Sequence, residues 1–218
     1  MELNKIKPGI YCIYKPKKIS SYDVIRKLKK ILGNKKYKIG HAGTLDVLAC
    51  GLLIVAIGKD YTKKLNEFLN QEKEYIAEIF LGAESTTDDE DGKKTKIKFN
   101  KKPSLQDIKK VLRKFIGKIW QIPPIFSAIK IKGKPAYWYA RHNKKINLEP
   151  RLIEIKDIKI LKYQWPILKI KVICGKGVYI RSLARDIGKE LKVGGYLKNL
   201  IRTRIGSFTL KQAIQLKP

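Results

Sequence analysis

The sequence from residue 41 to residue 58, HAGTLDVLACGLLIVAIG, places one carboxylate between glycines, directly before the most apolar run of the chain. Residues 52–57 are all apolar and the run ends at Gly58, which predicts a strand buried on both faces. The carboxylate, Asp46, is therefore expected in a loop at the mouth of a core strand. Such loops often carry catalytic side chains, although a loop aspartate is also a common turn or cap residue.

The rest of the chain predicts strands and helices in irregular order. Strands are expected at residues 9–14, 74–82, 151–160 and 165–174. Helices are expected after the N-cap pair Ser20-Ser21, over residues 61–69, after the capping box of Ser104 and Asp107, and from residue 180 to a cap at Gly194-Gly195. This order is typical of an α+β fold, with a central mixed, mostly antiparallel sheet and helices packed against it.

The charge of the chain predicts a polyanionic partner. Its 218 residues include 49 basic and 19 acidic side chains, a formal net charge of +30. Binding to phosphates would release condensed counterions. Biased codon usage is an alternative explanation, because 41 of the basic residues are lysine. The 8 arginines are better indicators of function, and six of them lie between residues 141 and 204.

Several classes of function are not supported. The three cysteines are widely spaced in apolar surroundings, which indicates reduced thiols in a cytoplasmic protein. Two histidines and no C-x-x-C pair make a metal site unexpected, and no nucleotide-binding fingerprint is present, so we expect no cofactor. The N-terminus lacks an apolar signal region and no apolar run is long enough to span a bilayer, so no membrane partner is expected.

The stretch from His41 to Gly51 resembles the catalytic motif of the TruB family of tRNA pseudouridine synthases, H-x-G-T-L-D-P-x-A-x-G, with Val47 in place of proline. Residues 15–21 resemble the family's K-P-x-G-x-S-S segment, with Lys18 where glycine is usual. Further resemblances follow in the family's order at residues 81–92, 121–130, 133–141, 174–183 and 200–208. In the segment at residues 133–141, Trp138 replaces a glutamate. An ordered set is far more specific than any single motif.

The resemblance implies uridine isomerisation at position 55 in the tRNA T loop, and it implies roles for individual residues. Asp46 would be the catalytic carboxylate and Arg181 its ion-pair partner, while Tyr75 would stack on the target base. His41 would fill the place of the flipped nucleotide, and Asp89 would contact that nucleotide. Taken alone, such residues are more often ordinary turn, core or surface residues. Further RNA contacts are expected from Lys15, Lys130, Arg141, Tyr179 and Arg202.

The same resemblance implies a pseudouridine synthase fold and its organisation. We expect residues 1–218 to form a single catalytic domain without the small C-terminal RNA-binding domain of many relatives. A basic, aromatic insertion at about residues 121–150 is expected to grip RNA and to be mobile without it. A monomer is expected. Two alternatives stay open: a pseudouridine synthase subunit guided by RNA and partner proteins, and a basic RNA-binding protein without catalytic activity.

Overall fold

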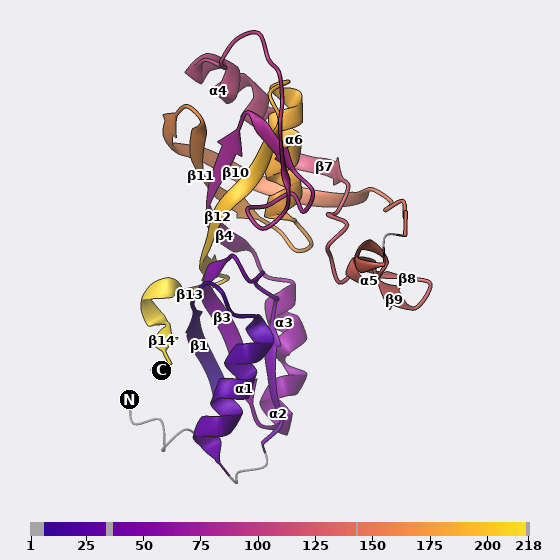
Figure 1. The fold of residues 1–218 in the computed structure, drawn as a ribbon. Helices are drawn as coiled ribbons and strands as arrows, with labels where there is room; N and C mark the ends of the chain where they lie inside the picture. The colour runs from indigo at the N-terminus through magenta and orange to yellow at the C-terminus, as the bar shows by residue number, and fades with distance from the viewer. Residues whose placement is uncertain (1–6, 34–36, 143, 217–218) are drawn as a thin grey trace. The chain divides into compact units, whose positions relative to one another are not determined.

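The computed structural model describes residues 7–33, 37–142 and 144–216. They form two compact units. The first consists of Met1–Ile76 and Leu200–Pro218, and the second of Ala77–Asn199. The chain passes between the units within two strands, β4 (Lys73–Leu81) and β12 (Gly195–Ile205) (Figure 1).

The first unit contains a mixed sheet with strand order β14-β1-β3-β12. Strand β1 is antiparallel to β3, whereas β14 is parallel to β1 and β12 is parallel to β3. Two further strands flank this path, because β2 pairs with β3 and β13 pairs with β12. The bounds are β1 Gly9–Lys15, β2 Ile39–Ala42, β3 Cys50–Ile57, β13 Phe208–Thr209 and β14 Ile214–Gln215. Every residue of β3 is buried, so the prediction of a core strand is confirmed.

Three α-helices lie in the described part of this unit. Helix α1 (Ser21–Leu32) begins at the predicted cap, where Ser20 and Asp23 form a capping box, and it packs through Val24 and Leu28 onto β1 and β3. The single helix predicted over residues 61–69 is wrong, because two short helices stand there: α2 (Lys59–Lys63) and α3 (Leu65–Leu69). The apolar spacing that suggested one helix spans both. A short 3-10 helix, η2 (Leu210–Gln212), precedes β14.

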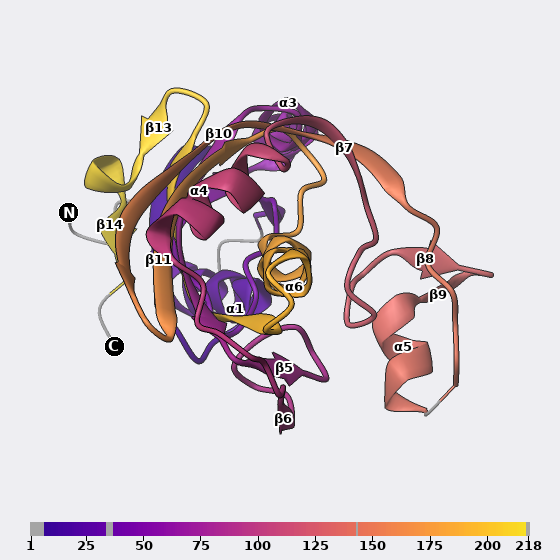
Figure 2. The same cartoon turned by 90° about the horizontal axis from the view of Figure 1, so that it is seen from above.

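The second unit contains the strand order β12-β4-β11-β10-β7. Strands β10 (Arg151–Gln164) and β11 (Ile167–Cys174) lie where two strands were predicted, and they pair antiparallel. Strand β7 (Gly117–Gln121) pairs antiparallel with β10. Helices α4 (Leu105–Arg113) and α6 (Ile180–Glu190) lie on the inner side of these curved strands (Figure 2). Helix α4 begins at Ser104 with the predicted capping box. The mixed sheet with helices against it confirms the α+β class.

The end of α6 differs from the prediction. Gly195 is the first residue of β12 rather than a helix cap, and Leu191 occupies the C-cap position. The backbones of α6 and β12 lie very close together where the chain turns from one into the other. A Cβ atom on Gly188 would lie 2.1 Å from the Gly195 nitrogen. Only glycine fits at such a contact.

Short hairpins extend from the second unit. The first pairs β5 (Ala83–Ser85) with β6 (Lys94–Lys96). The two strands are joined by residues 86–93, called the acidic loop below because they include four carboxylates. The second pairs β8 (Lys130–Ile131) with β9 (Lys134–Pro135) and leads into α5 (Ala136–Arg141). The second hairpin and α5 belong to the predicted insertion at residues 121–150, which stands away from the strands of its own unit in Figure 2. Asn143 of the insertion lies outside the described residues. Within the described part of the chain, no helix is long and apolar enough to cross a membrane.

Candidate active site

The loop that carries Asp46 connects β2 to β3 in the first unit and is bonded to the start of α1. The Ser21 hydroxyl accepts a hydrogen bond from the Leu45 nitrogen at 2.8 Å and donates to the Leu45 oxygen at 3.1 Å. The Lys18 nitrogen donates to the Val47 oxygen at 2.8 Å. Asp46 lies between these two attachments and is half-buried. Its carboxylate therefore sits on a loop whose backbone is fixed on both sides.

Lys18 and Val47, the two departures from the family pattern in this region, meet in that last hydrogen bond. Lys18 has a φ of 67°, a left-handed conformation that glycine adopts without strain. The structure thus keeps the backbone shape expected of the usual glycine. Val47 contributes its carbonyl oxygen, which proline would also offer.

Arg202 on β12 ties together the two ends of the Asp46 loop. Its side chain is 1% exposed, its Nε donates to the Leu52 oxygen at 2.8 Å, and its Nη2 donates to the Gly43 oxygen at 2.9 Å. Gly51 permits this arrangement, because a Cβ atom there would lie 2.3 Å from the Arg202 carbonyl oxygen. The predicted RNA contact of Arg202 does not fit a side chain without exposed surface, so we assign it to the support of the loop.

Lys15, at the end of β1, is equally inaccessible, with no exposed surface. Its Nζ donates to the carbonyl oxygens of Pro16 at 2.9 Å and Ile19 at 2.8 Å. Burial lowers the pKa of Lys15 to about 8, although the Cys50 thiol and the Asp46 carboxylate nearby act in the opposite direction. The predicted RNA contact of Lys15 does not fit this burial either. The residue contributes positive charge near Asp46 instead.

His41 and Tyr75 complete the candidate residues of this unit. His41 lies on β2 and is half-buried, and burial together with the nearby Arg202 guanidinium lowers its pKa. Its imidazole is therefore neutral at pH 7. Tyr75 lies on β4, in an alternating strand, and its side chain is buried.

In the second unit, Arg181 and Asp89 form a buried ion pair. The Arg181 Nη1 lies 3.7 Å from the Asp89 Oδ2, and both side chains are at most 7% exposed. Arg181 also donates to the oxygens of Thr87 at 3.4 Å and Phe126 at 3.0 Å. Burial raises the pKa of Asp89, against the opposing effects of the Thr87 hydroxyl and Arg181. The predicted pairing of Arg181 with Asp46, a residue of the other unit, stays a prediction.

The entry to helix α6 is held by a residue that the sequence did not single out, Gln121. Its Nε2 donates to the Tyr179 oxygen at 3.2 Å, and its Oε1 accepts from the Tyr179 nitrogen at 2.9 Å. Tyr179 is the N-cap residue of α6 and has no side-chain cap of its own, so Gln121 satisfies its backbone. The glutamine was visible in the sequence as part of the segment at residues 121–130, but nothing there indicated its partner.

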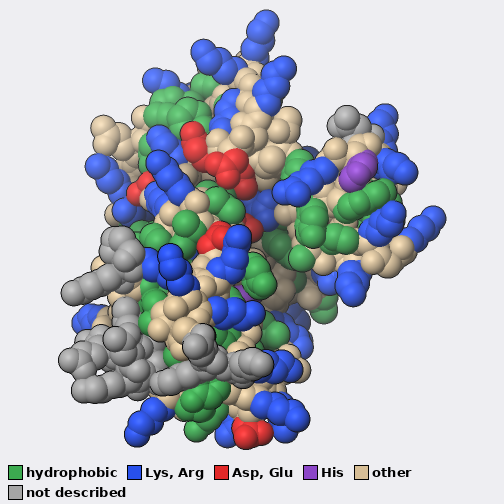
Figure 3. All heavy atoms as spheres, turned by 60° about the horizontal axis from the view of Figure 1, so that its bottom comes forward, with side chains coloured by type: hydrophobic (Ala, Val, Ile, Leu, Met, Phe, Trp, Pro, Cys, Tyr) green, Lys and Arg blue, Asp and Glu red, His purple; other side chains and the backbone are tan. Residues whose placement is uncertain are grey.

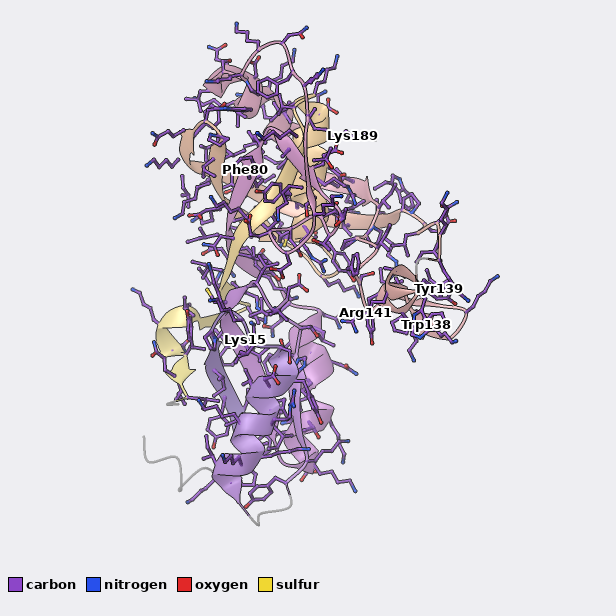
Figure 4. The ribbon with its side chains drawn as sticks, in the orientation of Figure 1. Lys15, Phe80, Trp138, Tyr139, Arg141 and Lys189 are labelled. Carbon is purple, nitrogen blue, oxygen red and sulfur yellow. The ribbon has the colours of Figure 1, made fainter. Side chains whose placement is uncertain are left out.

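The insertion presents its basic residues to solvent. Lys130 and Arg141 are exposed, and Figure 4 shows Arg141 beside Trp138 and Tyr139 on α5. The Trp138 ring is stacked on His142 at 4.1 Å between centroids and lies 3.7 Å from the Lys134 Nζ. Two of its ring contacts are thus made inside the insertion. On the face drawn in Figure 3, Lys and Arg side chains are spread widely rather than gathered in one patch.

Two further residues escaped the sequence reasoning, Arg185 and Asp88. The Arg185 Nη1 lies 2.9 Å from the Asp88 Oδ2, although 97 positions separate the two residues. The available signal was the spacing of four between Arg181 and Arg185, which places both on one face of a helix. In the described part of the chain, no three His, Cys, Asp or Glu side chains are grouped as a metal site would require.

Comparison with known proteins agrees with this arrangement. Residues 29–180 match the model of the TruB family pseudouridylate synthase, N-terminal domain. The tRNA pseudouridine synthase B of Clostridium novyi (strain NT) is 45% identical over 208 residues, which are 95% of this chain and 71% of the relative. The protein of the same name from Protochlamydia amoebophila (strain UWE25) is 43% identical over 206 residues, 94% of this chain and 77% of that protein.

Solved structures show the same fold. A chain in the crystal structure of a Cbf5-Nop10-Gar1 complex matches with a TM-score of 0.74 and 28% identity, over 99% of this chain and 53% of that one. A chain in the structure of an H/ACA RNP bound to a substrate RNA containing 2'-deoxyuridine matches with a TM-score of 0.69 and 26% identity, over 95% and 50%. This chain thus spans about half the length of both structural relatives. With a family model over residues 29–180 and curated relatives matched over most of their length, the chain belongs to the TruB family of pseudouridylate synthases.

Proposed function

We propose that this protein isomerises uridine to pseudouridine at position 55 in the T loop of tRNA. The observation that carries the proposal is the fixed loop around Asp46, because the reaction needs one carboxylate held in place against a substrate. Arg202 bonds both ends of that loop, while Ser21 and the Lys18 backbone bond it on either side of the aspartate. Family membership and the names of the curated relatives support the choice of reaction and substrate.

The reaction breaks the bond between N1 of uracil and C1′ of ribose, turns the base and rejoins it through C5. One bond to C1′ breaks and one forms, and the proton released from C5 is balanced by one taken up at N1. Substrate and product are therefore isomers, and no electron is gained or lost. Asp46 either attacks C1′ or takes the C2′ proton, and both routes need the carboxylate in its ionised form. Lys15 lies near enough to this carboxylate to interact with it electrostatically.

Two further residues of the first unit act on the base. Tyr75 stacks on the uracil and helps to remove the C5 proton, and its position in a buried strand gives it little freedom to move. His41 occupies the place that the flipped nucleotide leaves. Its neutral imidazole suits stacking among bases better than a cation that would seek a phosphate.

The second unit supplies Arg181 and the direct RNA contacts. Arg181 keeps Asp46 ionised and oriented, and the bonds to Asp89, Thr87 and Phe126 hold its guanidinium in one plane. Asp89 contacts the flipped nucleotide. Lys130, Arg141 and Tyr179 contact the RNA backbone, which suits the two exposed cations of the insertion. Within this proposal, residues 1–218 act as one catalytic domain.

The test is release of tritium from a tRNA transcript labelled at C5 of uridine, with the modified position mapped afterwards. The wild-type protein is expected to release one equivalent per tRNA at position 55. Asp46→Asn is expected to release none while binding tRNA within about 3-fold of wild type, because an amide can neither attack C1′ nor accept the proton. Normal turnover by Asp46→Asn would end the proposed mechanism.

A second candidate function is that of an RNA-guided pseudouridine synthase subunit. The match to a chain of a Cbf5-Nop10-Gar1 complex favours it, although this chain spans only about half of that one. The curated relatives are more similar in sequence and favour tRNA. Tritium release from tRNA by the protein alone would decide for the first candidate, and release only after addition of a guide RNA would decide for the second.

A further inference from the structure

The helix α6 carries two arginines one turn apart that bind neighbouring carboxylates. Arg181 pairs with Asp89, and Arg185 pairs with Asp88 at 2.9 Å. Side chains four residues apart lie on the same helix face, so both arginines point to the same acidic loop. The Arg185 side chain is 27% exposed and that of Asp88 is 16% exposed, so water screens this second pair only in part.

The backbone of the acidic loop reverses direction at Asp88. Its φ is 60°, a left-handed conformation that costs free energy for a residue with a Cβ atom. Its nitrogen donates to the Ser85 oxygen at 3.1 Å, and its oxygen accepts from the Leu197 nitrogen at 3.0 Å. The Arg185 contact adds a side-chain attachment to these two backbone bonds. Because Asp89 is the next residue, its direction depends on this turn.

Arg185 binds a second segment as well. Its Nη2 donates to the Ile122 oxygen at 2.9 Å, and its Nε lies 2.9 Å from the Asp186 Oδ1. The Ser182 hydroxyl donates to the same Ile122 oxygen at 2.9 Å. Ile122 begins the segment whose Phe126 oxygen accepts from Arg181. Three acceptors in three directions fix the plane of the Arg185 guanidinium, which a lysine could not reproduce.

We infer that Arg185 is a positioning residue, which holds the acidic loop and the 122–126 segment in place around Arg181 through its contacts with Asp88 and Ile122. The inference rests on the proposed function for its effect on turnover. In this role Arg185 acts without touching the substrate. Arg185 holds the acidic loop, which contains Thr87 and Asp89, and the 122–126 segment, which contains Phe126. These residues bind Arg181, so Arg185 affects the reaction through the orientation of Arg181.

The first experiment measures hydrogen exchange in the full-length protein, which needs no substrate. Arg185→Met and Asp88→Asn are expected to speed exchange in residues 85–92, and Arg185→Met also in residues 122–127. The matched control is Glu190→Gln, which removes the exposed pair of Glu190 with Lys114 at the far end of the same helix and should leave both segments unchanged. Unchanged exchange in Arg185→Met would overturn the inference whether or not the protein modifies tRNA.

The second experiment separates positioning from a purely structural role. In single-turnover tritium release at saturating enzyme, we expect Arg185→Met and Asp88→Asn each to slow the reaction about 10-fold or more, because small displacements of a catalytic arrangement have large kinetic effects. The tRNA Kd should stay within about 3-fold, and the double variant should be about as slow as either single one. A loss of affinity alone, or full additivity, would contradict the inference. A wild-type protein without any release would refute the proposed function instead, and hydrogen exchange would still decide on Arg185.

Discussion

Lys15 shows how the surroundings of one residue can reverse its expected role. It ends strand β1, lies without exposed surface and donates to two carbonyl oxygens, so it resembles a core hydrogen-bond donor more than a surface cation. A neutral amine still has two protons for the two carbonyl oxygens. The hydrogen bonds therefore survive deprotonation, and only the charge near Asp46 is lost.

The lowered pKa of Lys15 predicts a pH-dependent stability. Between pH 8 and about pH 10.5 the unfolded chain holds more protons at this position than the folded one, so the free energy of unfolding rises with pH across this window. The rise is at most about 3 kcal/mol. Lys15→Met should lack it, which urea unfolding of both proteins at several pH values would measure. Parallel pH profiles would contradict the burial of a charged amine here.

Arg181 offers a second test at the scale of the residue. Arg181→Lys should lower single-turnover tritium release by about 100-fold, because a point charge cannot keep the fork of bonds to the Thr87 and Phe126 oxygens and to Asp89. Affinity for tRNA should change little. Arg26→Lys on the exposed face of α1 is the control and should retain full activity. Near-normal release by Arg181→Lys would show that only the charge matters.

At the scale of elements, the Asp46 loop depends on the parallel contact between β3 and β12. Gly51 of β3 and Arg202 of β12 are paired residues in these two strands. The Arg202 side chain extends from this position to the loop, where it donates to the Gly43 oxygen. The strand that the sequence marks most clearly therefore needs a partner from the far end of the chain. The loop is shaped jointly by both.

This arrangement predicts the result of Arg202→Met. Two buried carbonyl oxygens lose a charged donor, which should lower the free energy of unfolding by about 2 kcal/mol. Tritium release should also fall at temperatures where the variant is fully folded, because Gly43 and Leu52 are no longer tied together. Arg204→Met, two positions along the same strand and partly exposed, is the matched control. Equal activity of the two variants would contradict the loop-supporting role.

At the scale of the whole molecule, the net charge of +30 governs association with RNA. Binding to several phosphates should make log Kd rise with log salt concentration, with a slope of about 3 or more. Filter binding between low and physiological salt measures this slope. Asp46→Asn should give the same slope, because Asp46 acts on the reaction rather than on the polyanion. A slope near zero would contradict electrostatic binding of tRNA.

The sequence by itself determined the features that local chemistry controls. The apolar run after Gly51 predicted the core strand β3, the capping boxes at Ser20 and Ser104 predicted two helix starts, and the alternation in residues 165–174 predicted β11. The ordered motifs indicated the family and the candidate residue Asp46. Each of these signals lies within about ten residues of the structure that it predicts.

Only the tertiary structure decided what the arginines and the buried lysine do. Lys15 and Arg202 are expected from the sequence to contact RNA, and Arg185 does not stand out there. A cationic side chain looks the same in a sequence whether it faces water or carbonyl oxygens. Their environments arise from strands and loops far apart in the chain, such as Gly43 and Arg202, or Asp88 and Arg185. Burial removes water from these side chains, and the folded backbone then supplies the oxygens that replace it.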